Sequence, residues 1–263
     1  MKPMFFGDSK RKLYGVYDAP TGNKRRSHAV LLCYPGVQEY STSLWGFRRL
    51  SAMLAQAGHH VLRFDYFGTG DSAGRVEEGA VDTWIADIQQ AALELKDISG
   101  ARQLSILGKR LGGALAVKAC QAGLDAKRLV LWDPVVHGSA YVSELETWDT
   151  RRNLLLLHAE RRGNGASELL GYPFPLTQRQ QLQSLNLVGE LPGSLRNVAI
   201  FASEPRDGYK RLHEAYVNAG LSSELLQAAD AAEGGQAGAQ GRAQLSGSIL
   251  ADMANKLEDT SAA

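Results

Sequence analysis

The segment Leu104–Ala116 joins a short apolar run, a glycine-flanked arginine and a stretch of small residues. Gly108 and Gly112 stand two positions on either side of Arg110. This is the spacing of the G-x-S-x-G turn, which presents a nucleophile between a strand and a helix. Serine, cysteine and aspartate are the nucleophiles expected there, whereas a guanidinium stays protonated and cannot attack a carbonyl carbon. The pattern therefore excludes an acyl-enzyme formed at this turn.

An arginine at this position has three roles open to it. It can form an internal ion pair, for which Glu39 and Asp133 are the nearest expected acids. It can bind the carboxylate or phosphate of a ligand, because its planar fork matches both and the helix that follows favours an anion at its start. It can also stabilise a developing oxyanion, with water activated by Glu39 or Asp133. Arg110, Glu39 and Asp133 are thus the candidate catalytic residues.

Five other residues are predicted to bind a ligand. Gly36 and Val37 follow a buried apolar run, where an oxyanion-hole loop would lie, and Leu111 follows the elbow arginine. His137 comes after an apolar run ending at Trp132, and ligands bind outside the carboxyl ends of strands in open α/β sheets. Structural packing is the alternative for His137. Tyr141 is one of the aromatic residues expected to line a pocket.

The base of a Ser-His-Asp triad is missing from its expected place. The histidine should follow the last strand, yet no histidine occurs after His213. His213 lies in a predicted helix, where it is expected to face solvent. Glu204 or Asp207 could take the place of the acid. The sequence therefore predicts a site that lacks both the nucleophile and the base.

Short apolar runs alternate with helical segments along the chain, which is typical of an α/β fold. The predicted strands cover 12–17, 29–33, 61–64, 104–107, 128–132 and 197–201, and the predicted helices cover 44–57, 83–96, 111–123, 209–219 and 249–257. Asp82 is the expected N-cap of the second helix. The pattern predicts a mostly parallel central sheet with helices on both faces.

Residues 139–192 interrupt this alternation, because they hold no clear strand and many polar, helical stretches. We expect them to form a helical cap inserted into a core made of residues 1–138 and 193–263. Residues 228–242 are rich in Ala, Gly and Gln, and we expect a mobile loop there.

Composition narrows the classes of protein. The 263 residues carry a formal net charge of +1. A chain this close to neutral has no overall positive charge that would attract nucleic acid or an anionic membrane. Cys33 and Cys120 are the two cysteines, which fits a reducing compartment and offers no metal-binding spacing. The N-terminal residues show no apolar signal-peptide region, and no apolar stretch approaches 18 residues. A cytoplasmic protein without a membrane span, a metal or another cofactor is predicted.

The sequence resembles the second of the two α/β-hydrolase-like families associated with the exosortase A system. The similarity is carried by Phe67–Gly74, Thr83–Asp87, the G-x-R-x-G elbow at Gly108–Gly113, Leu129–Val136, Gly138–Tyr141 and Gly171–Tyr172. The resemblance implies an α/β-hydrolase fold without the usual serine. It also implies a cytoplasmic protein, often encoded beside acyl-activating enzymes and an acyl carrier protein.

Three functions follow as hypotheses. The first is a divergent thioesterase- or acyltransferase-like protein that acts on or binds an acyl (thio)ester or carboxylate metabolite, free or carrier-bound. The second is a pseudoenzyme that keeps the pocket and only binds. The third is a scaffold for an acyl carrier protein or another biosynthetic partner. Whether the chain is an enzyme stays open at this point.

Overall fold

The computed structural model describes residues 1–21, 27–155, 168–189, 191, 195–228 and 247–258. The mobile loop predicted at 228–242 falls outside these residues beyond Ala228. None of the helices in the described part combines the length and the apolar character that crossing a bilayer requires.

Eight strands of the described chain form one sheet. They are β1 (Lys2–Phe6), β2 (Leu13–Asp18), β3 (His28–Cys33), β4 (His60–Phe64), β5 (Gln103–Lys109), β6 (Arg128–Trp132), β9 (Asn197–Ala202) and β10 (Ser222–Gln227), in the order β1-β2-β4-β3-β5-β6-β9-β10. β2 pairs antiparallel with β1 and β4, and the remaining neighbours pair in parallel. The predicted α/β architecture with a mostly parallel sheet is confirmed.

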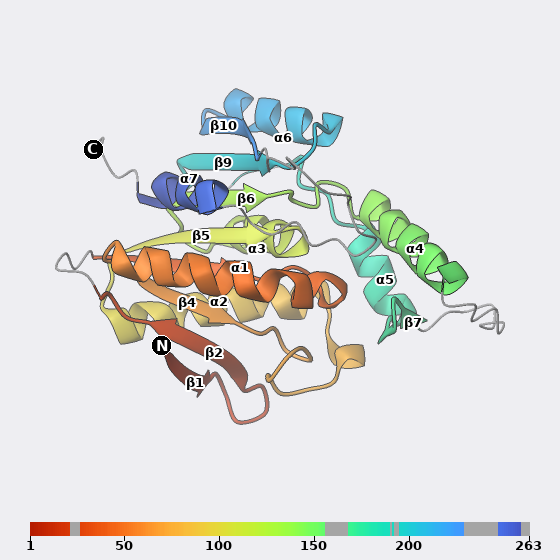
Figure 1. The fold of residues 1–263 in the computed structure, drawn as a ribbon, viewed down its shortest axis with the longest axis horizontal. Helices are drawn as coiled ribbons and strands as arrows, with labels where there is room; N and C mark the ends of the chain where they lie inside the picture. The colour runs from red at the N-terminus through yellow and green to blue at the C-terminus, as the bar shows by residue number, and fades with distance from the viewer. Residues whose placement is uncertain (22–26, 156–167, 190, 192–194, 229–246, 259–263) are drawn as a thin grey trace.

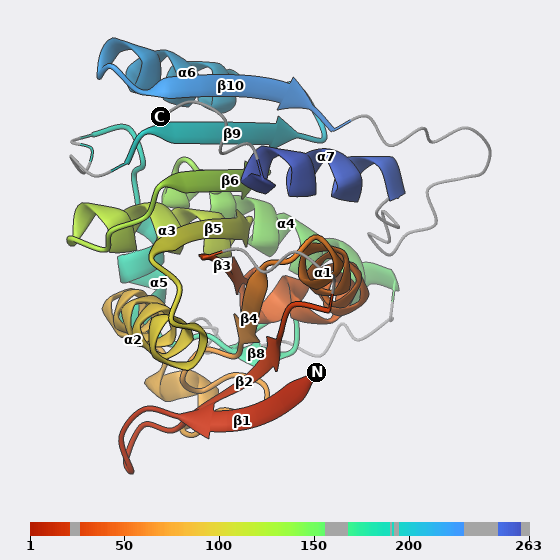
Figure 2. The same ribbon diagram turned by 90° about the vertical axis from the view of Figure 1, so that its left-hand side faces the viewer.

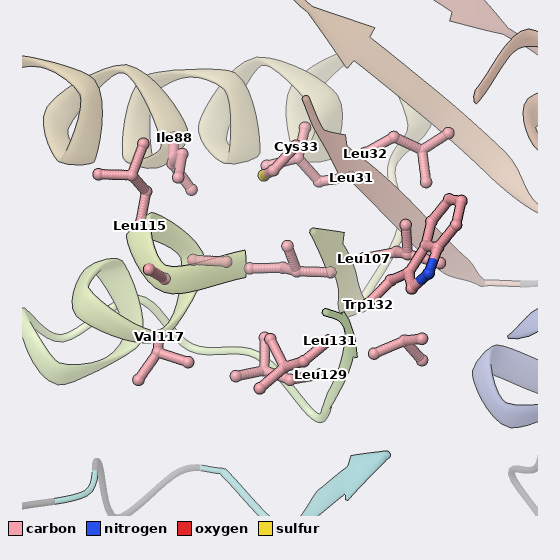
Figure 3. Close-up of a cluster of buried hydrophobic side chains, with 14 of the residues drawn as sticks. Leu31, Leu32, Cys33, Ile88, Leu107, Leu115, Val117, Leu129, Leu131 and Trp132 are labelled. Atoms are coloured by element: carbon pink, nitrogen blue, oxygen red, sulfur yellow. The ribbon is translucent and has the colours of Figure 1, made fainter. Parts of the chain in front are cut away.

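Helices cover both faces of this sheet. They are α1 (Val37–Gln56), α2 (Val81–Ser99), α3 (Leu111–Gln121), α6 (Asp207–Asn218) and α7 (Gly247–Glu258). α1 and α7 lie on one side, and α2 and α3 lie on the other (Figure 2). Every residue of β3 is buried, because a strand covered on both faces has no solvent side. In Figure 3, Ile88 and Leu115 lie on one side of the central strands, and Leu32, Leu107 and Trp132 lie on the other.

Several element boundaries differ from those predicted. α1 begins at Val37 rather than at residue 44. Asp82 is not the N-cap of α2, because Ala80 holds that position without a side-chain hydrogen bond. Asp82 lies in the first turn, where its negative charge interacts favourably with the positive end of the helix dipole. The edge strands β1 and β10 were not predicted. Both are largely exposed, so neither shows a buried apolar run.

The segment between β6 and β9 lies beyond the carboxyl ends of β5 and β6 (Figure 1). Its described elements are α4 (Gly138–Leu155), β7 (Glu168–Leu169), β8 (Tyr172–Pro173) and α5 (Leu176–Gln183), which we call the insertion. α4 and α5 lie in or at the start of the segment 139–192, for which a helical cap was predicted. The segment also holds a two-stranded hairpin, which the sequence did not reveal because two-residue strands give no periodic pattern.

Candidate functional site

Arg110 occupies the sharp turn between β5 and α3 with a positive φ, at φ 51° and ψ −118°. Such a backbone costs a residue with a side chain about 1–3 kcal/mol. Two glycines make the turn possible. A Cβ atom on Gly112 would lie 2.1 Å from the carbonyl oxygen of Tyr34, and one on Gly108 would lie 2.6 Å from the backbone of Gly112. The predicted elbow geometry is therefore present, with an arginine at its centre.

The Arg110 side chain lies in a network of charges that we call the Arg110 cluster. Its Nε is 2.8 Å from Glu39 Oε1, and its Nη2 is 2.6 Å from Glu144 Oε2. The Tyr141 hydroxyl donates to the second oxygen of Glu39 at 2.8 Å, and Arg206 approaches Glu144 Oε1 at 3.3 Å. Two cations thus face two carboxylates, so the cluster is close to neutral.

Burial and charge act in opposite directions on these groups. Burial lowers the pKa of Arg110, but the carboxylates of Glu39 and Glu144 outweigh it and hold the pKa above its usual value. Burial raises the pKa of Glu144, but Arg110 and Arg206 outweigh it and lower the pKa overall. Each member of this pair therefore favours the charged form of the other. Arg110 and Glu144 therefore stay ionised around neutral pH.

One of the two expected partners of Arg110 is confirmed and the other is wrong. Glu39 pairs with Arg110 as predicted, and Glu144 takes the place expected for Asp133. The carboxylate of Asp133 turns instead to Ser203, accepting from its N–H at 2.7 Å and its hydroxyl at 2.6 Å. Asp133 follows β6 and Ser203 follows β9, which are neighbours in the sheet. This placement brings Ser203 within reach of the carboxylate.

The predicted ligand-binding residues Gly36, Leu111 and Tyr141 converge. A Cβ on Gly36 would lie 3.0 Å from the Tyr141 hydroxyl and 3.3 Å from a methyl group of Leu111, while Val37 begins α1. Side chains of the chain itself therefore fill the space above Gly36. His137 is half-buried, and its backbone forms an isolated bridge with Asn186, so it ties the insertion to the sheet edge.

The residues considered as triad partners, His213, Glu204 and Asp207, lie in different surroundings. His213 does not simply face solvent: it is half-buried, and its Nδ1 lies 2.9 Å from the Ser223 hydroxyl. Glu204 and Asp207 are both exposed, and Asp207 is the first residue of α6. In the part of the chain that is described, no three acidic, His or Cys side chains are placed to hold a metal ion together.

Sequence reasoning missed Glu144, Arg206 and Tyr209. Glu144 shares a helical face with Tyr141 and Trp148, and this spacing was the available signal. The Tyr209 hydroxyl is buried and has no hydrogen-bond partner among the described residues. Burial and then the Asp133 carboxylate raise the pKa of Tyr209, while Arg206 lowers it. The backbone N–H of Tyr209 donates to the carbonyl oxygen of Arg206 at 3.0 Å, so the two residues are neighbours at the start of α6.

The Tyr209→Phe variant tests this orphaned hydroxyl. Because a buried polar group without a partner is costly, its removal is expected to raise the free energy of unfolding by about 1 kcal/mol. Urea unfolding followed by circular dichroism measures the change. A loss of stability of similar size would mean that the hydroxyl has a partner in solution.

Comparisons with known proteins agree with this architecture. A family model described as serine aminopeptidase, S33, matches residues 25–169. No curated protein matches the chain significantly. Among solved structures, proline iminopeptidase from Mycobacterium smegmatis is similar at 11% identity and a TM-score of 0.65, with 98% of each chain covered.

Two further solved structures show the same fold. Alpha/beta hydrolase domain-containing protein 10 from mouse is 14% identical, with a TM-score of 0.61 and 98% of each chain covered. Ferulic acid-bound Est1E from Butyrivibrio proteoclasticus is 16% identical, with a TM-score of 0.62, over 85% of this chain and 88% of that one. The predicted α/β-hydrolase fold is confirmed.

Proposed function

Since the chain belongs to the serine aminopeptidase S33 family of α/β hydrolases, we propose that it is a member that binds an acyl thioester or carboxylate metabolite without forming an acyl-enzyme. One observation carries the proposal. Arg110 stands at the elbow, and Glu39 and Glu144 hold its guanidinium from two sides. A neutralised cation thus occupies the position of a nucleophile, in a chain with no histidine after His213.

The hydrogen bonds of the two remaining acids argue against a base that activates water. Both oxygens of Glu39 accept hydrogen bonds, one from Arg110 and one from Tyr141. Both oxygens of Asp133 accept hydrogen bonds from Ser203. Their oxygens are already engaged, so proton abstraction from water would first require these contacts to open. This supports binding over turnover.

Two residues at the edge of the cluster are suited to hold the ligand. Arg206 is 44% exposed while it contacts Glu144, so a ligand carboxylate can reach it from solvent. The Tyr209 hydroxyl is buried beside the same charges and lacks a partner, so it can donate to a ligand carbonyl oxygen. We infer that acyl groups lie between α6 and the insertion.

The resemblance to the exosortase A-associated family suggests that the ligand is attached to an acyl carrier protein. Its association with acyl-activating enzymes favours a thioester on an acyl carrier protein in the cytoplasm as the form that is bound. The phosphate of a carrier arm would meet Arg206 at the exposed rim, where arginine binds phosphate well.

The test is native mass spectrometry with a panel of acyl thioesters, free and carrier-bound, combined with a product assay. We expect a retained ligand, no covalent adduct and no product. Tyr209→Phe is expected to weaken binding about tenfold, as the loss of one good hydrogen bond would. Tyr216→Phe is the matched control, because its hydroxyl is also buried and unpartnered among the described residues but stands seven residues, about two turns, further along α6.

The other outcomes overturn the proposal in different ways. Product formation that is lost in Glu39→Gln would make the chain an enzyme with water activated by that acid. Carrier binding that is unchanged in Tyr209→Phe would favour a scaffold that does not use the pocket. If Tyr209→Phe and Tyr216→Phe weaken ligand binding equally, the loss of binding comes from a general change in structure and not from a contact with the ligand.

A further inference from the structure

A cavity of about 750 Å³ lies between α1 and the outer strands β1, β2 and β4. Its volume is in the range of small-molecule sites. None of the five residues of the Arg110 cluster lines it. In Figures 1 and 2, α1 runs beside these strands, whereas α4 and α6, which carry Glu144 and Tyr209, lie elsewhere on the molecule. The cavity is therefore separate from the proposed acyl site.

The floor of the cavity is one face of the sheet. Pro3 pairs with Val16, and Val16 pairs with Arg63, so these three side chains lie side by side on β1, β2 and β4. Tyr14 precedes Val16 by two residues and shares its face. An aromatic ring, two apolar side chains and one guanidinium thus form a continuous surface.

The roof comes from one side of α1. Tyr40, Leu44 and Arg48 follow each other at four-residue spacing, which places them on one helical face. Trp45 is 77% exposed, and the guanidinium carbon of Arg48 lies 5.6 Å from the centre of its ring. An exposed tryptophan beside an arginine offers a flat apolar surface next to a positive charge.

Arg63 lacks a close carboxylate partner, although its side chain is only 13% exposed. Its Nε is 3.9 Å from Asp18, and Asp18 accepts a hydrogen bond from Ser51 at 2.5 Å with the same oxygen. The described protein offers no hydrogen-bond acceptor to this Nε. The other contacts of the guanidinium are the sulfur of Met1 and the side chain of Tyr34, which is a neutral partner. An arginine this little exposed normally pairs with a carboxylate at closer range.

The acidic end of the cavity is more fully satisfied. One oxygen of Asp65 accepts the Tyr40 hydroxyl at 2.6 Å, and the other accepts the N–H of Asp71 at 3.0 Å. Asp71 itself is exposed. The unmet requirement in this cavity is thus an acceptor for the Arg63 Nε and a close counter-charge for its guanidinium, which favours an anionic ligand over a cationic one.

We propose that this cavity binds an aromatic carboxylate. The carboxylate accepts hydrogen bonds from the guanidinium groups of Arg63 and Arg48, and the ring packs against Trp45 and Tyr14. Charge-assisted bonds from arginine suit a planar carboxylate, and the rings provide the apolar surface that orients it.

Isothermal titration calorimetry of the full chain with 2-naphthoate tests the proposal. The controls are 2-naphthylmethanol, a neutral analogue of similar shape, and 2-naphthylmethylamine, its cationic counterpart. We expect 2-naphthoate to bind with one site per chain and the two analogues to bind at least about tenfold more weakly, because they cannot accept from arginine as a carboxylate does.

Variants locate the binding on the protein. Arg63→Met is expected to weaken 2-naphthoate binding about tenfold, and Arg102→Met, an exposed arginine outside the cavity, is expected to leave it unchanged. If Arg63→Met fails to fold, Trp45→Ala and Arg48→Met serve instead, since both side chains are exposed. Either is expected to weaken binding severalfold.

The proposal is overturned by absence of 2-naphthoate binding, by equal binding of the three compounds, by preference for the amine, or by unchanged binding in all three cavity variants. Preference for the amine would assign the site to Asp65 and Asp71. If 2-naphthoate binding is lost in Tyr209→Phe but not in Trp45→Ala, the compound binds in the acyl site, and this cavity has no ligand.

Discussion

Replacing Arg110 by methionine is expected to lower the free energy of unfolding by about 3 kcal/mol, as for a buried ion pair that loses one partner. The Arg110 side chain is 7% exposed, and those of Glu39 and Glu144 are 12% and 23% exposed. The substitution leaves both carboxylates without their main counter-charge. Arg206 and Tyr141 still reach them, which keeps the loss at the low end for buried pairs. Chemical denaturation measures it.

An arginine of the insertion, Arg179 on α5, provides the control. Arg179 pairs with Glu146, and their side chains are 21% and 44% exposed, so this pair is more open to solvent than the Arg110 cluster and contributes less. Arg179→Met is therefore expected to cost no more than about 1 kcal/mol. Adding Glu39→Gln to Arg110→Met is expected to recover part of the loss, because it removes one uncompensated charge. Equal losses in the two arginine variants would show that the Arg110 cluster is not a stabilising element.

Gly112→Ala is expected to be the most damaging single-methyl change at the elbow. The added Cβ would lie 2.1 Å from the carbonyl oxygen of Tyr34 and 2.4 Å from that of Cys33. Both are backbone atoms at the end of β3, so neither can rotate away. We expect a loss of about 3 kcal/mol or more, above the usual cost of overpacking, or failure to fold.

Gly189→Ala is the matched control for this prediction. Among the described residues, no atom outside the chain neighbours lies within 4 Å of a Cβ built on Gly189, and its φ is not positive. Its unfolding free energy is expected to stay within about 0.5 kcal/mol of the parent. If thermal unfolding gives similar values for the two alanine variants, α3 does not pack against β3 as closely as the structure shows.

Local patterns in the sequence were sufficient for the frame of the molecule. Buried apolar runs predicted the central strands, since a strand covered on both faces shows no alternation. The spacing of Gly108 and Gly112 around Arg110 predicted the elbow, because close approach of helix and strand there leaves no room for a side chain. The exposed edge strands β1 and β10 were missed for lack of that signal.

Only the tertiary structure decided what surrounds Arg110. Glu39 and Glu144 stand 71 and 34 residues from it in sequence, and each arrives on a different helix. Asp133 was an equally reasonable partner by its position in the chain. Because β6 pairs with β9, however, Asp133 lies beside Ser203 and accepts its hydrogen bonds instead. An ion pair depends on atoms a few ångströms apart, and such distances are set by how the helices and strands pack. Residue types fix which charges exist, and the fold fixes which of them meet.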